Sequence, residues 1–85
     1  MMTIIPGELY THNQPQIAAR ELFDTKREPL FRIKPSENFL VTAITPDPKI
    51  ENLEWIQVLW EEQIGWFCLL LNSNFLTHVP MIPKG

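Results

Sequence analysis

The chain of 85 residues has one cysteine, three glycines and no long hydrophobic run. A single cysteine, Cys68, excludes an internal disulfide, so a reducing compartment is the simpler setting. Three scattered glycines exclude a glycine-rich phosphate-binding loop. The longest apolar run, IGWFCLLL at 64–71, is too short to cross a bilayer. The N-terminus also lacks the basic and apolar regions of a signal peptide. We therefore expect a cytoplasmic protein that does not bind a membrane.

The sequence also lacks the residue clusters that carry enzyme chemistry. A metal site needs three or four ligands at close spacing, and His12, Cys68 and His78 form no such motif. Because Cys68 lies in an apolar run, we expect a buried structural residue rather than a nucleophile. Glu61 and Glu62 are adjacent in a predicted turn, where their side chains point apart. We therefore expect no enzyme, no cofactor and no metal.

The charges divide unevenly along the chain, whose net charge is −3. The segment 20–34 has five basic and three acidic residues, whereas 37–62 has six acidic residues and one lysine. Nucleic-acid binding usually needs a basic face, so we expect no nucleic-acid partner unless Lys26, Arg27 and Lys34 gather in space. The acidic segment is either a solvated loop and turn, which is the simpler interpretation, or a patch that attracts a basic partner.

Prolines and alternating apolar residues predict an all-β chain. Eight prolines mark loops and edges, because proline does not sit in central strands or helix interiors. The segment 16–23 could form two helical turns or a strand, and the surrounding pattern favours the strand. Short strands separated by turns predict one small antiparallel barrel. The remaining strands are predicted from β-branched and aromatic residues at 7–12, 30–33, 38–44, 53–60, 64–71 and 75–79.

All three tryptophans lie in one predicted hairpin, LEWIQVLWEEQIGWF at 53–67. Ile56 and Val58 are its natural core residues, and Trp60 continues their face of the strand. We therefore expect Trp60 to be mostly buried. Trp55 lies on the other face, where we expect it to be half exposed and available to a partner. Packing of Trp55 against the loop 45–52 is the alternative.

The strand at 64–71 is apolar on both of its faces. Gly65 predicts a bulge or a close approach that a Cβ atom would prevent. We expect Leu69 and Leu71 to join Phe31 and Phe39 in the core, so Leu70 must be covered by something else. Either the first strand or a second copy of the chain could cover it, and a homo-oligomer through this leucine-rich strand is one expectation.

Three segments together resemble the SH3-like barrels, and most closely the bacterial SH3 (SH3b) domains. They are ENFLV at 37–41, WIQV at 55–58 and GWF at 65–67. In that family, a strand after a turn is followed by a W-x-x-V strand, a short distal turn and G-W-[VIF]. The resemblance covers about 16–79. It implies a small antiparallel SH3-like barrel, to which 7–12 adds an N-terminal extra strand.

A further likeness reaches the peptide-binding SH3 domains. LFD at 22–24 resembles part of their A-L-Y-D-Y motif, and SNFL at 73–76 resembles their S-N-Y-V ending. The likeness implies a groove for a proline-rich ligand, with acidic residues that meet a basic residue of that ligand. Thr25 and Asn72 stand where that family has a second tyrosine and the groove proline. The implied groove residues are Phe23, Trp55 and Phe75, and the implied acidic residues are Asp24 and Glu28.

The sequence as a whole predicts a non-enzymatic protein–protein interaction module, an adaptor or an inhibitor, with a basic or proline-containing protein partner. Trp55 beside Glu54 favours this function, because an aromatic anchor with a charged rim is the usual composition of a binding hot spot. The alternative is a structural or assembly subunit of a larger complex, for example a phage-encoded one. The predicted partner-binding residues are Phe23, Asp24, Glu28, Glu54, Trp55 and Phe75.

Overall fold

The computed structural model describes residues 4–21, 28–70 and 75–80, and within these ranges the chain forms strands and no helix. The predicted all-β class is therefore confirmed. In the ambiguous segment 16–23, residues 17–19 form a strand as preferred, and residues 22 and 23 lie outside the described residues. The predicted turn at 72–74 lies outside the described residues. The strands are β1 (Leu9–His12), β2 (Ile17–Ala19), β3 (Phe31–Ile33), β4 (Phe39–Pro46), β5 (Leu53–Trp60), β6 (Gln63–Leu70) and β7 (Leu76–Val79).

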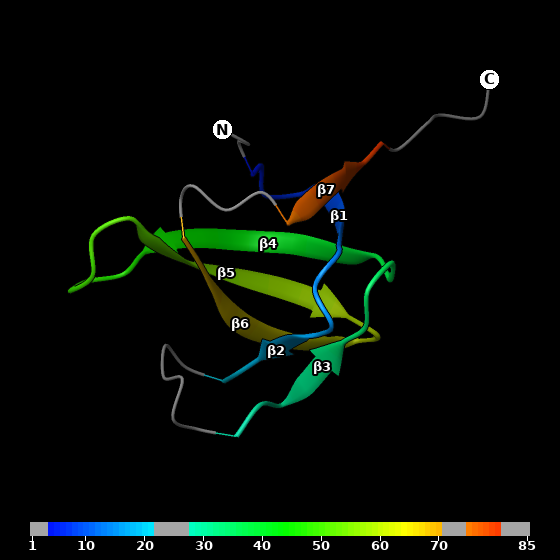
Figure 1. Cartoon of the computed structure of the whole chain (residues 1–85), viewed down its shortest axis with the longest axis horizontal. Coiled ribbons are helices and arrows are strands. Elements are labelled where there is room, and N and C mark those ends of the chain that lie inside the picture. Colours follow the sequence, from blue (N-terminus) through cyan, green and yellow to red (C-terminus); the bar gives the residue numbers. More distant parts are fainter. Residues whose placement is uncertain (1–3, 22–27, 71–74, 81–85) are drawn as a thin grey trace.

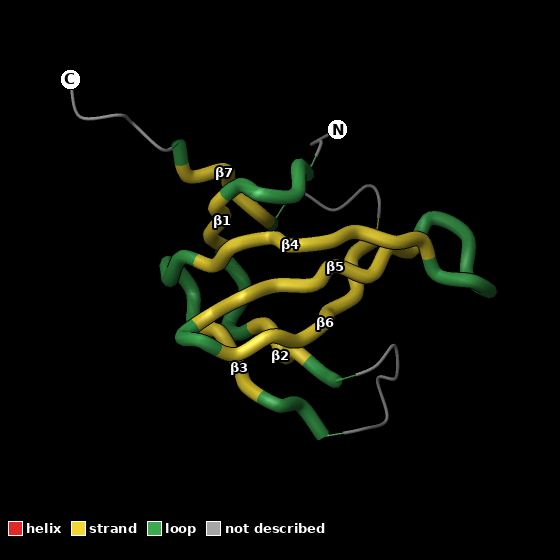
Figure 2. Tube along the Cα trace, turned by 180° about the vertical axis from the view of Figure 1, so that it is seen from behind, coloured by secondary structure: helices red, strands yellow, loops and turns green. Residues whose placement is uncertain are grey.

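Five of these strands form one antiparallel sheet in the order β6-β5-β4-β1-β7, and β2 pairs with β3 separately. Figure 1 shows β4, β5 and β6 as a meander, with β1 and β7 at one side of it and the β2–β3 pair below β6. The same arrangement is seen from behind in Figure 2. The chain leaves the sheet after β1, forms the β2–β3 pair, and returns to the sheet as β4.

The N-terminal strand lies inside the sheet, where the sequence predicted an addition outside the barrel. β1 pairs with β4 on one side and with β7 on the other. It buries Tyr10 and His12 in the interior. The His12 Nε2 atom lies 2.8 Å from the Ile33 carbonyl oxygen, and the Gln14 amide donates to His12 Nδ1 at 3.1 Å. β1 therefore ties the sheet to β3.

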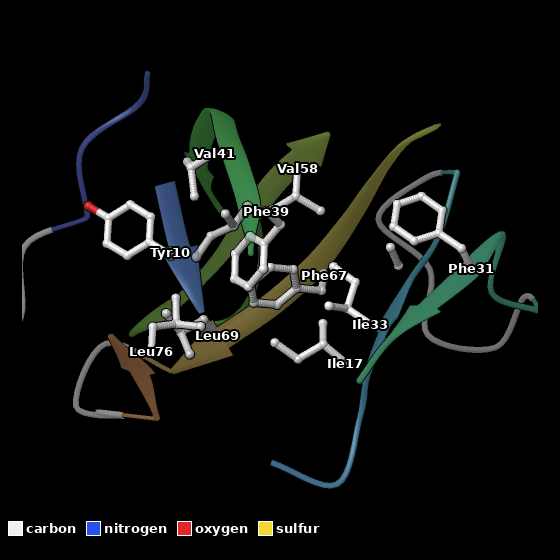
Figure 3. Packing of buried hydrophobic residues seen from close by; sticks show 12 residues of the cluster. Tyr10, Ile17, Phe31, Ile33, Phe39, Val41, Val58, Phe67, Leu69 and Leu76 are labelled. Carbon is white, nitrogen blue, oxygen red and sulfur yellow. The ribbon is translucent and has the colours of Figure 1, made fainter. Parts of the chain in front are cut away.

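The core fills the space between the inner face of the sheet and the β2–β3 pair (Figure 3). Phe39 and Phe67 meet edge to face at its centre, with ring centroids 6.1 Å apart. The predicted core positions Phe31, Phe39 and Leu69 are confirmed as buried, and Leu71 lies outside the described residues. The other buried members are Tyr10, Ile17, Ala19, Ile33, Val41, Ile56, Val58, Phe67 and Leu76.

Gly65 brings the two layers together. A Cβ atom at this position would lie 2.9 Å from the Ala19 Cβ and 3.1 Å from Phe31 Cε1. The predicted close approach is therefore confirmed. The predicted bulge is not at Gly65, which pairs in regular register with Val58. The bulge lies in β4 between Val41 and Ala43, and it leaves one extra residue in that strand.

Candidate binding surfaces

Trp55 is buried, and the prediction that it is half exposed is wrong. Only 3% of its surface is accessible. Its indole N–H donates to Asp47 Oδ1 at 2.7 Å. Asp47 Oδ2 accepts from the amides of Lys49 at 2.9 Å and Ile50 at 2.8 Å. This carboxylate therefore closes the loop between β4 and β5 and holds it against Trp55, which is the alternative that the sequence left open.

Asp47 is charged in its loop over a wider pH range than a free aspartate. The hydrogen bond from Trp55 lowers its pKa the most, followed by the hydrogen bonds from the amides of Lys49 and Ile50. All three donors favour the ionised carboxylate. Asp47 is thus engaged within the chain, and it is less available to a basic partner than the sequence predicted.

Trp60 is partly buried and packs against the core, in agreement with the prediction of a mostly buried side chain. It lies at the end of β5 and stacks on Phe31 with ring centroids 5.5 Å apart. It packs on the core from its edge because β5 ends at this residue. The prediction that Ile56 and Val58 face the core is also confirmed, since both side chains are fully buried.

Of the other predicted partner-binding residues, the structure describes Glu28, Glu54 and Phe75, which lie on three different parts of the fold. Glu54 is half-buried and stands opposite Leu69 in the sheet, on the face that Trp55 does not share. Glu28 is exposed next to β3. Phe75 is half-buried, packs on the core and lines a cavity described below. Phe23 and Asp24 lie outside the described residues, as do the basic residues 26 and 27.

The acidic residues of 47–62 lie at two separate ends of the β5–β6 hairpin. Glu51 is exposed in the loop before β5, and Glu61 and Glu62 are exposed in the turn after it. At roughly 3.3 Å per residue, the eight-residue strand between them spans about 26 Å. They therefore do not form the single acidic patch that the sequence suggested.

Between these two ends, the hairpin presents a face without charge. We call it the outer face, because it points away from the core and none of its residues belongs to the core cluster. Ile64 and Leu70 are its most exposed members, at 53% and 50%. Seven of its eight side chains are apolar, counted over four cross-strand pairs: Leu53 with Leu70, Trp55 with Cys68, Gln57 with Trp66, and Leu59 with Ile64.

This outer face departs from the usual pattern of a two-layer β protein. The solvated face of an antiparallel sheet normally carries polar residues that alternate with core residues. The single polar side chain of the outer face, Gln57, is held by a hydrogen bond within the sheet: the Thr42 hydroxyl donates to its Oε1 atom at 3.0 Å. Ile64 and Leu70 are the exposed members at its two ends, and the side chains between them are buried or partly buried. Exposed apolar side chains that continue into such a face can mark an interaction site. The sequence already contained the evidence for this apolar face: every second position of 64–70 is apolar, and these residues were not needed for the core.

A second feature is a cleft that opens where β2 separates from β6. The two strands join at one antiparallel bridge, in which Arg20 and Trp66 exchange backbone hydrogen bonds of 2.7 Å each. Beyond this bridge, toward the start of β2, a cavity of about 270 Å³ opens to the surface. We call it the β2–β6 cleft. Its lining residues are Gln14, Gln16, Ile17, Ala18, Arg20, Phe67, Cys68 and Phe75.

Cys68 is half-buried at the side of this cleft, where the sequence predicted a buried cysteine. Because Leu69 takes the core position on β6, its neighbour Cys68 points to the opposite face. Within the described ranges, no three His, Cys, Asp or Glu side chains converge in a way that could hold a metal ion. No helix in those ranges has the length and hydropathy to cross a membrane.

No protein-family model, curated protein sequence or solved structure matches this chain.

Proposed function

We propose that the chain is a non-enzymatic protein–protein interaction module with an SH3-like fold. The strand order supports the fold assignment, because the last strand lies beside the first and a three-stranded meander completes the sheet. In an SH3-like assignment, β1 is the first strand of the barrel, and the β2–β3 pair belongs to the long connection that follows it. This differs from the sequence-based expectation, in which β1 was an addition.

The outer face is the surface through which we propose that the chain binds its partner. An interface typically has an apolar centre from which charged residues are depleted, surrounded by a polar rim. The outer face has this composition, since Trp66, Ile64 and Leu70 lie on an uncharged surface that ends at acidic residues on both sides. The complementary partner is a protein with an apolar patch and basic groups near its ends. An adaptor or inhibitor that binds such a partner is the function that these residues support best.

A structural or assembly subunit is the second candidate function. Leu70 supports it, because neither β1 nor any other described strand covers this half-exposed side chain. Interfaces between identical subunits are more apolar than those of transient complexes. In this case the outer face would meet a second copy of the chain, and the protein would associate with itself at micromolar concentration.

Charge substitutions on the outer face test the proposal. Ile64→Lys and Leu70→Lys each place an ammonium group on this surface without touching the core. Ile50→Lys is the matched control, because Ile50 is equally exposed at 56% but lies in the loop before β5. We expect both outer-face variants to lose about tenfold or more in affinity for a partner captured from host-cell lysate, and Ile50→Lys to keep it.

Sedimentation velocity of the same proteins separates the two candidate functions. A wild-type monomer whose captured partner is lost in the outer-face variants supports the adaptor or inhibitor. A wild-type oligomer that Ile64→Lys dissociates supports the assembly subunit. Capture that is equal in all four proteins, together with an unchanged sedimentation coefficient, would reject the outer face as the working surface.

A further inference from the structure

A row of aliphatic side chains crosses the five-stranded sheet from one edge strand to the other. Each of its members is directly paired with the next member on the neighbouring strand, and directly paired residues project from the same face of a sheet. We call these residues the aliphatic row. The pairs are Val79 with Leu9, Leu9 with Leu40, Leu40 with Leu59, and Leu59 with Ile64.

The aliphatic row lies on the outside of the sheet. Successive residues of a strand alternate between its two faces, and Tyr10 and Phe39, which neighbour two row members along their strands, are buried in the core. No row member is buried or belongs to the core cluster: four are partly exposed, and Ile64 is exposed at 53%. The row shares Leu59 and Ile64 with the outer face and continues from there across β4, β1 and β7.

One end of the row is acidic. Polar residues border the row on the side of the β5–β6 turn, two positions along each strand from its members. In the turn itself, Glu61 and Glu62 are exposed, next to the end that Leu59 and Ile64 form. No basic residue stands in this border, so a ligand with a basic group at this end would lie in a favourable field. The border residues are Thr77, Thr11, Asn38, Glu61 and Glu62.

The spacing of the row matches the pitch of an α-helix. Neighbouring strands lie about 4.8 Å apart, so the five members span about 19 Å along the surface. A helix advances by about 5.4 Å per turn. An amphipathic helix that crosses the strands would therefore place about one side chain between each two row members. Apolar residues at i, i+4, i+7 and i+11 of such a helix would fill the intervals, over about three to four turns.

A helix suits this surface better than an extended peptide or a second copy of the chain. The main-chain groups of a sheet bond within the sheet, so its face offers none to a ligand. An extended peptide on the row would leave its own N–H and C=O groups unpaired, whereas a helix bonds them internally. A second copy brings no helix in the described ranges. Two sheets that pack face to face also share a whole apolar face rather than one row.

We propose that the aliphatic row binds an amphipathic helix of a partner protein, with a narrow apolar stripe and a basic end beside Glu61 and Glu62. Recognition of a helix in this way depends on apolar anchors that repeat once per turn. The proposal rests on the function proposed above, because it names the kind of segment that the partner presents to the end of the outer face. It adds the part of the sheet that the outer face does not include, with Leu40 at its centre.

Titration of a designed helical peptide into isotopically labelled protein tests the row by NMR. The probe is the acetylated and amidated peptide ALAQALQALAQALAKK, in which four leucines form one stripe and two lysines form a basic end. A second peptide has glutamates in place of the two lysines. A third has proline in place of its second glutamine, which prevents a continuous helix. Circular dichroism measures the helicity of each peptide.

We expect the lysine peptide to shift the amide signals of Leu40 and Ile64 and to bind about tenfold more tightly than the proline peptide. The lysine peptide should also bind more tightly than the glutamate peptide, because Glu61 and Glu62 attract its basic end. The double change Glu61→Gln with Glu62→Gln should remove this preference. Both positions are exposed in the turn, so these changes leave the core untouched.

Two lysine variants separate the row from the rest of the outer face. Leu40→Lys places a charge at the centre of the row and should lower the affinity for the lysine peptide about tenfold. Leu70→Lys is the matched control, because Leu70 lies on the outer face but not in the row. Denaturant unfolding establishes that both variants are folded. Loss of the peptide in Leu40→Lys supports the row even where Leu70→Lys keeps a captured partner, a result that would reject only the function proposed above.

Four results would overturn the proposal. The first is the absence of shifts at Leu40 and Ile64 with the lysine peptide at millimolar concentration. The second is an equal affinity for the lysine and proline peptides, since the ligand would then not need to be helical. The third is a wild-type oligomer that Leu40→Lys dissociates, which would place a second copy of the chain on the row. The fourth is full binding of the lysine peptide by Leu40→Lys while Ile64→Lys and Leu70→Lys lose the captured partner, which would leave the outer face as the working surface without the row.

Discussion

The indole N–H of Trp55 and the Oδ1 atom of Asp47 lie 2.7 Å apart, in a hydrogen bond that joins β5 to the loop before it. The same carboxylate accepts two amides of that loop through its other oxygen. Asp47 is therefore both the cap of its own loop and the partner of a buried tryptophan. This hydrogen bond holds the loop against Trp55, which stands on the outer face with only 3% of its surface accessible.

Removal of the Asp47 carboxylate should expose Trp55. We predict that Asp47→Ala shifts tryptophan emission to longer wavelength and increases quenching by acrylamide, because the loop loses the three hydrogen bonds that the Asp47 carboxylate accepts. The measurement is made in a background in which Trp60 and Trp66 are phenylalanine, so that Trp55 alone reports. Glu51→Ala is the control in the same loop. Identical emission spectra for the two variants would contradict the structural role of Asp47.

Acid should remove the stabilisation that the Asp47 carboxylate gives to its loop. The folded-state pKa of Asp47 is lowered from its ordinary value of 3.8, mainly by the Trp55 hydrogen bond. A lowered pKa means that the stabilisation is fully present above the unfolded-state value and is lost as the pH falls through the folded-state pKa. We predict that stability falls below about pH 3.8 in the wild type and falls less in Asp47→Asn. Urea unfolding at a series of pH values measures the stability of the wild type and of Asp47→Asn. Parallel curves of stability against pH for the two proteins would contradict the prediction.

An alanine at position 65 should destabilise the contact between β6 and the β2–β3 pair. The new methyl group would meet the Ala19 Cβ at 2.9 Å. We predict that Gly65→Ala lowers the free energy of unfolding by about 1–3 kcal/mol. The double variant with Ala19→Gly should recover part of this loss, because it removes the closest atom. Strictly additive effects of the two changes in denaturant unfolding would show that the two positions are not in contact.

The two residues of the turn between β5 and β6 are unfavourable for the backbone angles that the turn requires. Glu61 and Glu62 both have positive φ angles, 48° and 65°. Two-residue hairpin turns of this type prefer Asn-Gly, since glycine adopts positive φ without steric cost. We predict that the double change Glu61→Asn with Glu62→Gly stabilises the fold by about 1 kcal/mol. The control is Glu61→Gln with Glu62→Gln, which removes the charges but keeps the strain. An equal gain in both variants would attribute the effect to charge instead.

The hairpin was the most predictable part of the fold. The bounds of β5 follow from a proline-free run with β-branched and aromatic residues, and β6 begins one residue before its predicted start. Gly65 indicated a close approach through its missing side chain, which the structure confirms. These features depend on local sequence and on the alternation of the two faces.

Features set by distant contacts could not be predicted in the same way. β1 is an internal strand because it pairs with β7 as well as β4; its partners in β7 lie 64 to 70 positions away, and no local pattern encodes them. The bulge near Thr42 contains no glycine to mark it. Trp55 was assigned to the surface because it lies on the face of the strand opposite Ile56 and Val58, whereas it is buried and hydrogen-bonded to Asp47 of the preceding loop. The outer face was visible only as surplus apolar residues in 64–70.

A comparison of two tryptophan variants in one capture experiment tests most directly where the working surface lies. Trp66→Ala removes the central half-buried tryptophan of the outer face, and Trp55→Phe removes the N–H that donates to Asp47 while it keeps an aromatic ring at that position. Circular dichroism first establishes that both are folded. We predict that a partner bound by the wild type is lost with Trp66→Ala and kept with Trp55→Phe. Retention with Trp66→Ala together with loss in Trp55→Phe would contradict the outer face as the binding surface and return that role to Trp55.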